Sequence, residues 1–412
     1  MTTSTAPVGV TPVRGRSPTA RLLAAPAADL AAHVTTHGPL PVLGGPQLVA
    51  LLEASGLAGR GGAGFPTWRK LADVPATATG STVVVANGAE GEPASSKDAV
   101  LLADAPHLVL DGLVLAGTAL GARELHLYAG AHALHAVRTA LTERPGLRVT
   151  LTEAPDTFIS GEESAVVRAL AGGPAVPHDR TTRITRRGLG GAPTLVQNVE
   201  TLAHLALAAR HGAAWFRTVG PTDDPGTRLV TLSGDVAHPG VLEVASGTNL
   251  AALLRDAGTD PTTVRAVLVG GYHGAWVPGP ELSRTELSVA SLHRFGATPG
   301  AGVVHVLGVH RCGLTAAAEI ATWLGEQSAR QCGPCVNGLP TMAATLTRLA
   351  RRSPDPELPR EITRLAALVT GRGSCRHPDG TARMVASTLR AFGHDVSLHR
   401  QGRCEATPGQ RR

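Results

Sequence analysis

The feature that most constrains this chain is a glycine-rich segment over residues 56–70. Five of its first nine residues are glycine, and Phe65-Pro66, Arg69 and Lys70 follow. Glycine has no Cβ, so the backbone can adopt left-handed conformations and its N–H groups can approach an anionic or planar ligand closely. The segment is therefore predicted to be a loop that cradles a phosphate or a cofactor.

The two common nucleotide motifs do not account for this loop. Residues 59–64 match the G-x-G-x-x-G pattern, but a dinucleotide-binding fingerprint requires a strand before the glycines. Here the preceding segment has the leucine spacing of a helix, and the β-branched strand over 82–86 comes after the loop. The sequence contains no Gly-Lys-Ser or Gly-Lys-Thr, which excludes a P-loop. A structural glycine turn stays open as the alternative interpretation.

Length and composition predict several globular domains. A chain of 412 residues exceeds what one core usually organises. The net charge is +6, but no basic helix or aromatic-interleaved basic stripe is present, so nucleic-acid binding is not expected. A diffuse positive surface suits the docking of an acidic electron-transfer partner, although a solvated arginine-rich surface explains it equally well.

The sequence predicts a cytoplasmic protein. Every Ala/Leu-rich window is interrupted by His, Arg or Asp before it reaches the about 18 residues of a membrane span. Residues 1–20 are rich in Thr, Pro and Arg and lack the apolar core of a signal peptide. The five cysteines are therefore expected to serve thiol or metal chemistry and not disulfides.

The hydrophobic pattern divides the chain into three structured parts. From 41 to 225, helix and strand patterns alternate, which predicts a mainly parallel α/β sheet with flanking helices. From 226 to 309, short β-branched runs with Gly/Pro turns surround one helix over 250–257 and predict a small α+β domain. From 310 to 402, four amphipathic helices predict a bundle. Residues 1–40 are expected to be an N-terminal extension with a short helix over 22–33, and 403–412 a tail.

Polar residues gather where elements of the α/β part end or begin. The strand over 82–86 runs into Asn87, Glu90 and Glu92, and strand ends of this kind bind ligands in open α/β sheets. Ser160 with Glu163 matches a capping box, which predicts a helix start there. Residues 191–201 are expected to open another helix, with Val199, Leu202 and Leu205 facing inward.

The cysteines offer two interpretations. Cys332-Gly-Pro-Cys335 is used by thioredoxin-type redox sites, but these need a strand directly before the motif, and here a helix precedes it. Two thiolates in a Cys-x-x-Cys with the distant Cys375 instead suit an iron–sulfur cluster. Cys312 is interpreted as a buried thiol.

Together these motifs resemble the flavin- and NADH-binding F-type subunits of bacterial NADH-quinone oxidoreductase, a family that NAD-linked hydrogenase and formate dehydrogenase diaphorases share. The resemblance covers about residues 40–398, and the strand-end motif is also similar to the flavin-binding C subunit of ion-pumping ferredoxin oxidoreductases. It implies a Rossmann-like α/β domain that binds FMN and NADH, a soluble-ligand-binding β-grasp (SLBB-like) domain, and a helical iron–sulfur domain.

The resemblance also implies cofactors and site residues. NAD(P)H would give hydride to FMN, and electrons would leave through a cluster, expected to be [4Fe–4S], without any acid/base dyad. Its metal ligands would be Cys332, Cys335 and Cys375. The cofactor-binding residues carried over from the family are Gly59, Arg60, Gly61, Gly62, Ala63, Phe65, Lys70, Asn87, Glu90, Glu92, Phe158, Gly161, Glu162, Glu163, Asn198 and Thr201.

The sequence departs from the family at several of these sites. Ala329 stands where the first cysteine ligand is expected, so the fourth donor is open between Cys404, His377 and solvent, and a smaller cluster or none is an alternative. Phe158 replaces a tyrosine. The family's adenine-stacking phenylalanine aligns near Arg183, which leaves NADH against NADPH undecided.

Two functions follow as hypotheses. The first is a flavin-dependent NAD(P)H dehydrogenase (diaphorase) subunit whose partner is a ferredoxin, a thioredoxin-fold [2Fe–2S] subunit, or a membrane complex to which it binds peripherally on the inner face. The second is a non-catalytic scaffold for docking, a paralogue that has lost the cluster or the flavin.

Overall fold

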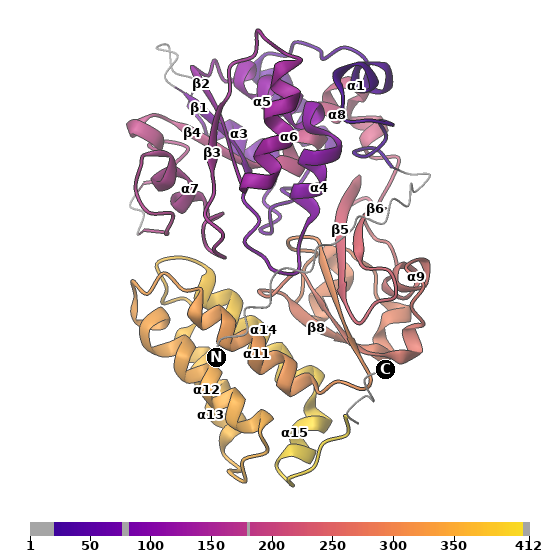
Figure 1. Ribbon diagram of the computed structural model, residues 1–412, viewed down its shortest axis with the longest axis vertical. Helices are drawn as coiled ribbons and strands as arrows, with labels where there is room; N and C mark the ends of the chain where they lie inside the picture. Colours follow the sequence, from indigo (N-terminus) through magenta and orange to yellow (C-terminus); the bar gives the residue numbers. More distant parts are fainter. Residues whose placement is uncertain (1–19, 76–81, 179–181, 407–412) are drawn as a thin grey trace.

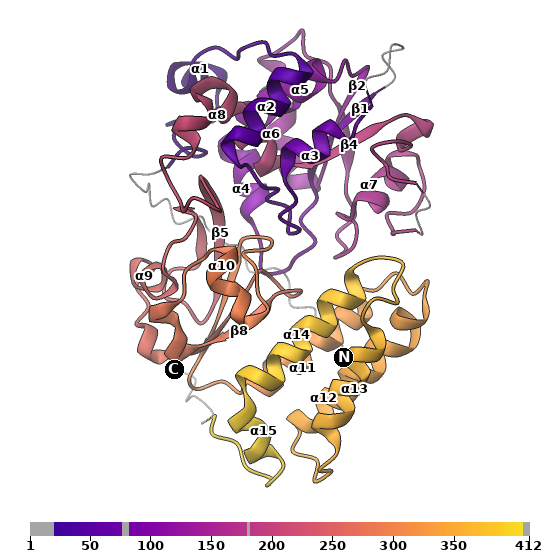
Figure 2. The ribbon, with the colours of Figure 1, turned by 180° about the vertical axis from the view of Figure 1, so that it is seen from behind.

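The computed structural model describes residues 20–75, 82–178 and 182–406. An α/β part lies at the top of Figure 1, with a second sheet and a helical bundle below it on opposite sides. Figure 2 shows the same arrangement from behind, so the bundle and the second sheet both face the lower edge of the α/β part. The predicted mixed α/β class, with a parallel sheet and a helical C-terminal part, is confirmed.

The first sheet is fully parallel and has the strand order β3-β2-β1-β4. Its strands are β1 (Val83–Gly88), β2 (Glu124–Ala129), β3 (Thr150–Glu153) and β4 (Thr194–Asn198). Successive side chains of a strand point to opposite faces, and in β1 both faces are covered. Val84 and Ala86 pack into the large core that contains α5 and α8, whereas Val83 and Val85 pack into a smaller core with α7. Burial on both faces explains why this strand is an unbroken apolar run.

The helices of this part lie on both faces of the sheet. They are α1 (Leu30–His37), α2 (Gly45–Ser55), α3 (Thr67–Ala72), α4 (Lys97–Asp104), α5 (Pro106–Ala119), α6 (Ala131–Thr142), α7 (Glu163–Leu170) and α8 (Val199–Phe216). Among the described residues no single helix is long and apolar enough to cross a membrane; α4 and α5, bent by 95°, meet that test only as a pair, by length and composition.

Three local predictions for this part were wrong. The helix expected over 22–33 is α1, which begins at Leu30 because Asp29 caps it, accepting from Ala32 N at 2.8 Å. The segment expected to open a helix at 191 is instead strand β4, paired with β1, and the helix starts at Val199. The capping box at Ser160 is not formed, because Glu162 is the N-cap of α7 and the Ser160 hydroxyl donates to Thr157 O.

The second sheet is mixed, with the order β6-β5-β9-β7-β8. Its strands are β5 (Thr227–Gly234), β6 (Gly240–Ala245), β7 (Val264–Val269), β8 (Ala275–Pro278) and β9 (Val303–Gly308); β5 and β9 are parallel and the other pairs antiparallel. One face, including Val267 and Val269, packs on α9 (Leu250–Asp256) beside the short α10 (Val289–Leu292). The other face, including Ala266 and Leu268, packs on the helical bundle.

The C-terminal part is a bundle of four long helices with one short helix after them. They are α11 (Gly313–Glu326), α12 (Leu339–Ala350), α13 (Leu358–Val369), α14 (His377–Ala391) and α15 (Gly393–His399). Helix α12 packs between α11 and α13, and α14 contacts both α11 and α13, so the four long helices close a ring around one apolar core. The four helices predicted here are confirmed.

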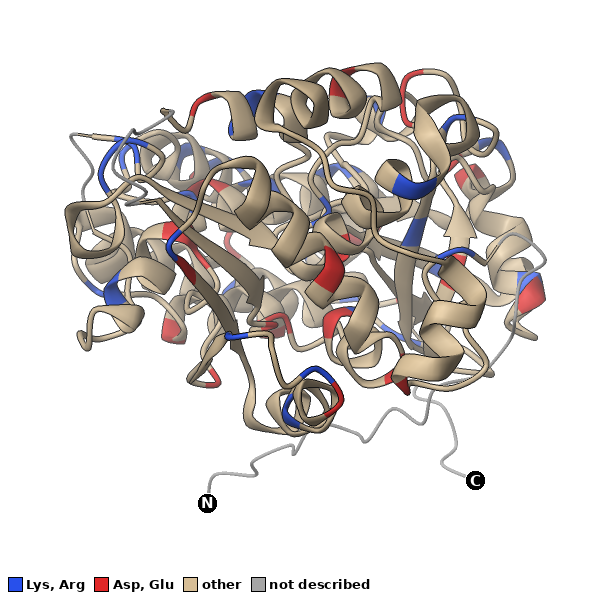
Figure 3. Ribbon diagram, turned by 90° about the horizontal axis from the view of Figure 1, so that it is seen from above, with Lys and Arg blue, Asp and Glu red and all other residues tan. Residues whose placement is uncertain are grey.

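Charged residues of both signs are interspersed over the face that Figure 3 shows. Interspersed charge favours neither sign of ligand over that face.

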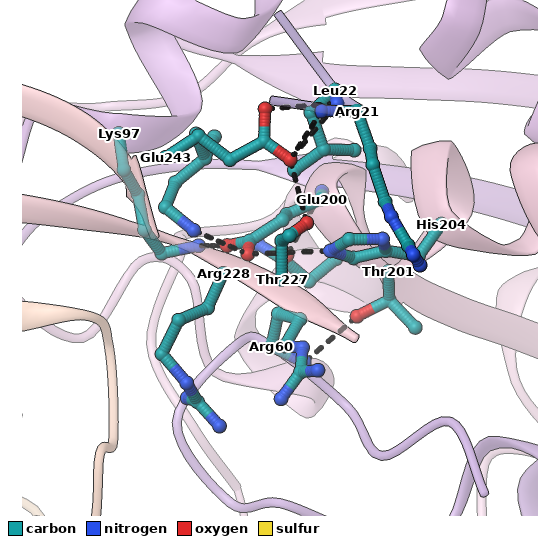
Figure 4. A network of polar contacts seen from close by, with 12 residues as sticks. Arg21, Leu22, Arg60, Lys97, Glu200, Thr201, His204, Thr227, Arg228 and Glu243 are labelled. Carbon is teal, nitrogen blue, oxygen red and sulfur yellow. Dashed lines mark hydrogen bonds and ion pairs between the residues drawn. The ribbon is translucent and has the colours of Figure 1, made fainter. Parts of the chain in front are cut away.

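A buried carboxylate, Glu200, joins helices of the α/β part to the second sheet (Figure 4). Lys97 Nζ of α4 lies 2.7 Å from Glu200 Oε2 of α8 and 2.9 Å from Asp98 Oδ1. The other Glu200 oxygen accepts from Leu229 N of β5 at 2.9 Å. Burial alone would raise the pKa of Glu200, but the Lys97 ammonium holds it well below its usual value. The carboxylate is therefore charged and joins three elements.

A second carboxylate also joins the two sheets. Glu92, in the loop after β1, accepts from Tyr272 N at 2.7 Å, in the turn between β7 and β8. The Cβ of any residue replacing Gly271 would lie 2.4 Å from Glu92 Oε2, so only glycine allows this approach. Burial raises the pKa of Glu92 to about 7.

We predict that Lys97→Met destabilises the protein by about 3–5 kcal/mol, because it leaves the Glu200 carboxylate buried without its cation. Denaturant unfolding measures the change. In the double variant Lys97→Met with Glu200→Gln, the amide keeps the acceptor for Leu229 N and much of the loss should be recovered. Equal midpoints for Lys97→Met and the wild type would contradict the analysis.

We also predict a pH-dependent contribution from Glu92. A carboxyl group whose folded pKa is raised stabilises the fold fully below the unfolded pKa, and this stability is lost as pH rises through the folded pKa. The free energy of unfolding of Glu92→Gln, relative to wild type, should therefore increase between about pH 4.5 and pH 7. Unfolding at pH 5 and pH 8 measures this change, with the exposed Glu53→Gln as the control; a constant difference between Glu92→Gln and wild type would refute it.

Candidate functional site

The glycine-rich segment forms a closed, exposed loop. Gly59 N donates to Phe65 O at 2.9 Å, and Ala58 pairs with Pro66, so the two ends of the loop meet. Gly62 has φ 117° and Gly64 φ 62°, conformations that favour glycine. A Cβ on either would enter open space, so the backbone of this loop is accessible. Phe65, at its end, is 52% exposed.

The Arg60 side chain turns inward from this loop. It is 3% exposed, its Nη1 lies 3.2 Å from Asp224 Oδ1, and its Nη2 donates to Pro225 O at 3.0 Å. Its backbone N donates to the Thr201 hydroxyl at 2.8 Å (Figure 4). Both groups are thus committed within the protein, and they anchor the loop to α8 and to the segment before β5.

Four segments meet at the carboxyl edge of the first sheet. A Cβ on Gly61 would lie 3.1 Å from the Asn198 Cβ, which places the glycine loop against the end of β4. Asn198 Oδ1 caps α8, and its Nδ2 donates to Asp98 Oδ2 at 2.7 Å. From the neighbouring strand β1, Asn87 Nδ2 donates to Gly161 O at 2.9 Å. The structure therefore brings the loop, both strand ends and the start of α7 to the edge where open α/β sheets bind ligands.

The predicted acidic residues are held in place by backbone amides. Glu90 accepts from the amides of Asp98 and Ala99, each at 3.2 Å, and from the Ser95 hydroxyl, so it caps α4. Burial and the neighbouring Asp98 raise the pKa of Glu90 to about 7. Glu92 is committed to Tyr272 N, as described above. Two carboxyl groups that titrate near neutrality within one loop are typical of a functional site.

The start of α7 closes the site from the other side. Glu162 accepts from Ser164 N at 2.8 Å and from Ala165 N at 3.2 Å, which satisfies the first amides of the helix. Lys70 Nζ of α3 forms an ion pair with Glu163. The side chains of these two predicted site residues therefore meet, one from each wall.

Phe158 joins this site to the helical bundle. Its backbone N donates to Gln327 Oε1 at 3.2 Å, just after α11. Its ring centroid lies 4.6 Å from that of His273 and 5.5 Å from that of Trp323. Sequence reasoning missed Gln327 and His273, because neither belongs to a motif and both reach Phe158 only through the fold.

His377 takes part in the same junction. Its Nδ1 is 3.1 Å from His273 Nε2, and its Nε2 is 2.8 Å from Leu324 O. Since a carbonyl oxygen only accepts, Nε2 carries the proton and donates. Both ring nitrogens are therefore occupied, which removes His377 as a fourth cluster donor in this arrangement.

The three predicted metal ligands gather at one end of the bundle. Cys332 Sγ lies 3.6 Å from Cys335 Sγ, in the segment between α11 and α12. Burial, the Cys332 thiol and the charge at Cys375 raise the pKa of Cys335 to about 12. Burial also raises the pKa of Cys375, with the charges of Glu162 and Cys332 adding to the shift. The three thiols therefore lie within electrostatic reach of one another at this end of the bundle.

This donor set fits an iron–sulfur cluster better than a thioredoxin-type site. The element before Cys332 is helix α11 and not a strand. Cys375 adds a third thiol to the pair, whereas a redox dithiol needs two. Three thiols match three irons of a [4Fe–4S] cluster, and Ala329 supplies no donor for the fourth.

Cys404 lies at the other end of the bundle. Its sulfur forms a compact group with Cys312, the residue that caps α11 at its start, whereas Cys332 follows the end of the same helix. Helix α11 has 14 residues, so its ends are about 20 Å apart. Cys404 is therefore out of reach of Cys332 and Cys335.

Comparison with known proteins agrees with this geometry. Residues 52–207 match the family model of the Nuo51 FMN-binding domain, and residues 315–399 match that of the NADH-ubiquinone oxidoreductase-F iron-sulfur binding region. The chain is 30% identical to the NADH-quinone oxidoreductase F subunit 2 of Rhizobium meliloti (strain 1021) over 373 residues, which cover 86% of this chain and 88% of that protein. It is 27% identical to the NADH-quinone oxidoreductase F subunit of Rickettsia felis, over 86% of this chain and 89% of that one.

Solved structures agree as well. A NAD⁺-reducing [NiFe]-hydrogenase in the H₂-reduced state matches with a TM-score of 0.78 and 28% identity, over 86% of this chain and 62% of that chain. The air-oxidized state matches with a TM-score of 0.78 and 27% identity, over 93% and 65%. The chain thus spans less than two thirds of these hydrogenase chains. By the identity, the coverage and the two family models, the chain belongs to the family of NADH-quinone oxidoreductase F subunits.

Proposed function

We propose that this chain is a flavin-dependent NADH dehydrogenase (diaphorase) subunit that carries electrons from NADH through FMN to an iron–sulfur cluster and on to a redox partner. The observation that carries the proposal is the position of residues 158–163. This segment contacts the sheet edge through Gly161 O and Asn87, and it contacts the bundle through Phe158 N and Gln327. The charge of Glu162 also acts on Cys375. One short segment therefore separates the two proposed cofactor sites.

The residues around the glycine loop divide into contacts and supports. FMN, when bound, supplies the hydride acceptance and the release of single electrons. The accessible backbone of Gly62 and Gly64 and the exposed Phe65 ring are available to a planar ligand. Lys70 offers its ammonium to a phosphate in exchange for Glu163.

The other site residues predicted from the sequence act mainly by positioning in our proposal. Arg60 and Thr201 fix the loop, Glu90 fixes α4, and Glu92 fixes the second sheet. The full proposed set keeps Gly59, Gly61, Ala63, Asn87, Phe158, Gly161, Glu162 and Asn198 as the wall of the same edge.

Cys332, Cys335 and Cys375 are the proposed cluster ligands. Their thiols are grouped by geometry and by mutual charge. With His377 occupied and Cys404 distant, we propose that the fourth iron of a [4Fe–4S] cluster takes a solvent ligand. An iron exposed in this way would be the first that the cluster loses.

NADH is the proposed donor, in keeping with the names of the relatives. Fewer residues can be proposed for binding the adenine of the nucleotide than for binding the flavin. Arg183 is 80% exposed and pairs with Asp73 at 3.5 Å, so its guanidinium stands at the surface. A preference for NADPH over NADH would favour a role for Arg183 in binding a 2′-phosphate.

We further propose the setting in which the chain works. Its domains would be 41–225 for FMN and NADH, 226–309 as an SLBB-like β-grasp domain, and 310–402 for the cluster, with 1–40 as an extension and 403–412 as a tail. The β-grasp assignment is supported by a mixed five-stranded sheet with one covering helix. A cytoplasmic location suits five cysteines that form no disulfide in the described part of the chain. Since the relatives are subunits, we propose a partner that carries a [2Fe–2S] centre, either a ferredoxin or a thioredoxin-fold subunit, or a membrane complex bound at its inner face.

Reconstitution with FMN, iron and sulfide tests the function against the scaffold alternative. The enzyme should gain flavin absorbance, a broad brown shoulder and NADH:ferricyanide activity, whereas a scaffold would stay colourless.

We predict that Lys70→Ala weakens FMN binding about 10-fold or more, because it removes one charge-assisted hydrogen bond. Flavin fluorescence quenching measures this affinity.

The control for Lys70 is its neighbour Arg69→Ala. The Arg69 guanidinium lies over the Trp68 ring at 5.1 Å, so the variant removes a nearby cation without touching the proposed phosphate contact. Equal FMN affinities in Lys70→Ala and the wild type would remove Lys70 from the site.

The cluster proposal predicts a gain on restoring the missing thiol. Ala329→Cys should supply the fourth iron with a cysteine, and the cluster should then keep its iron in air for longer than in the wild type. Iron and sulfide analysis with EPR of the oxidised protein measures the loss of one iron. Cys335→Ser should lose the cluster in either background. Identical iron loss in Ala329→Cys and the wild type would show that the fourth iron is not the exposed one.

A further inference from the structure

A second group of metal-binding side chains lies at the opposite end of α11 from the proposed cluster. It consists of Cys312 before α11, His399 at the end of α15, and Cys404 in the segment that follows. Their ligand atoms all lie within 4.8 Å of one another. We propose that these three residues bind a single divalent transition metal, with Zn²⁺ as the best fit.

The spacing matches a tetrahedral zinc site. Cys312 Sγ and His399 Nε2 are 3.5 Å apart. Two ligands at zinc distances of about 2.3 Å for sulfur and about 2.0 Å for nitrogen, at the tetrahedral angle, are separated by about 3.5 Å. The pair therefore needs little movement to accept the ion.

The orientation of His399 supports the metal site independently of the spacing. The ring is buried, 1% exposed, and its Nδ1 lies 3.1 Å from Leu349 O of α12. A carbonyl oxygen only accepts, so Nδ1 carries the proton and the lone pair of Nε2 faces the sulfur. Histidines that bind metals almost always donate their other N–H in this way.

The charge balance around the group suits a divalent cation. Two thiolates would neutralise the ion. The acidic side chains of Asp395 and Glu405, close in sequence to His399 and Cys404, are already paired, Asp395 with Arg265 Nη2 at 2.7 Å and Glu405 with His394 Nε2 at 2.7 Å. Two sulfurs and one imidazole form a donor set that selects zinc over magnesium, calcium or manganese. Cys312 and Cys404 are partly exposed, which leaves a fourth position to water.

This site is separate from the iron–sulfur site. The length of α11 places the two groups about 20 Å apart. The iron–sulfur family match, over residues 315–399, includes neither Cys312 nor Cys404. The metal would cross-link the fold, because it would tie the C-terminal segment and α15 to the junction of β9 with α11.

Metal analysis of the full-length protein tests the proposal. After expression with zinc and iron, the wild type should hold about one zinc per chain in addition to its iron, and Cys312→Ser and Cys404→Ser should lose the zinc and keep the iron. Cys332→Ser should lose iron and keep zinc, which separates this outcome from failure of the cluster proposal. His394→Ala is the matched control, because this exposed histidine on the same helix lies outside the group.

Co²⁺ substitution in the wild type tests the site without any variant, so its result does not depend on whether the variants fold. Co²⁺ in place of zinc should give thiolate-to-metal charge-transfer bands and the intense d–d bands of a tetrahedral site, and chelation should lower the melting temperature. Two results would overturn the proposal: zinc that stays bound in Cys312→Ser and Cys404→Ser, or a Cys312–Cys404 disulfide in protein purified without oxidant, seen as the loss of two titratable thiols and two mass units.

Discussion

The contact between residues 158–163 and the end of α11 is the constraint on which the rest of the structure depends. The sheet edge that would hold a flavin and the bundle end that would hold a cluster belong to different hydrophobic cores. Phe158 packs between Trp323 and His273, and its amide is fixed by Gln327. Electron transfer between the two proposed sites would need a fixed separation, and this packed aromatic junction ties the two parts together.

The second sheet keeps that junction in register. It has one face on the bundle, through Leu268 and Trp276, and it is tied to the α/β part by Glu200 and by Glu92. Carboxylates removed from water are costly unless amides or cations satisfy them. The buried Glu200 and the partly buried Glu92 each accept a backbone N–H from the second sheet. A sheet held at both sides in this way fixes the position of the α/β part relative to the bundle.

Sequence could predict what is local and periodic. The apolar run of β1, the amphipathic helices of the bundle and the Cys-x-x-Cys with Cys375 all carry their own signals. Strand β4 did not, because five residues ending in the N-cap Asn198 look like the approach to a helix, and only pairing with β1 makes them a strand. Arg60 lies among glycines that were predicted to face a ligand, yet its partner Asp224 is 164 residues away and turns it inward. For the same reason Cys312, His399 and Cys404 form a group that no spacing rule detects.

The absence of the family's first cysteine ligand, at Ala329, changes the charge that a cluster would carry. Without the first cysteine, the proposed ligands are Cys332, Cys335 and Cys375, and burial raises the pKa of the Cys335 and Cys375 thiols. A cluster held by three thiolates would carry less negative charge than one held by four, and the charge of Glu162 acts on Cys375, one of the three proposed ligands. One fewer thiolate therefore reduces repulsion between the cluster and the segment that must stay packed against it. In the proposed cluster the cost would be one iron open to solvent, held by no cysteine because Ala329 stands at that position.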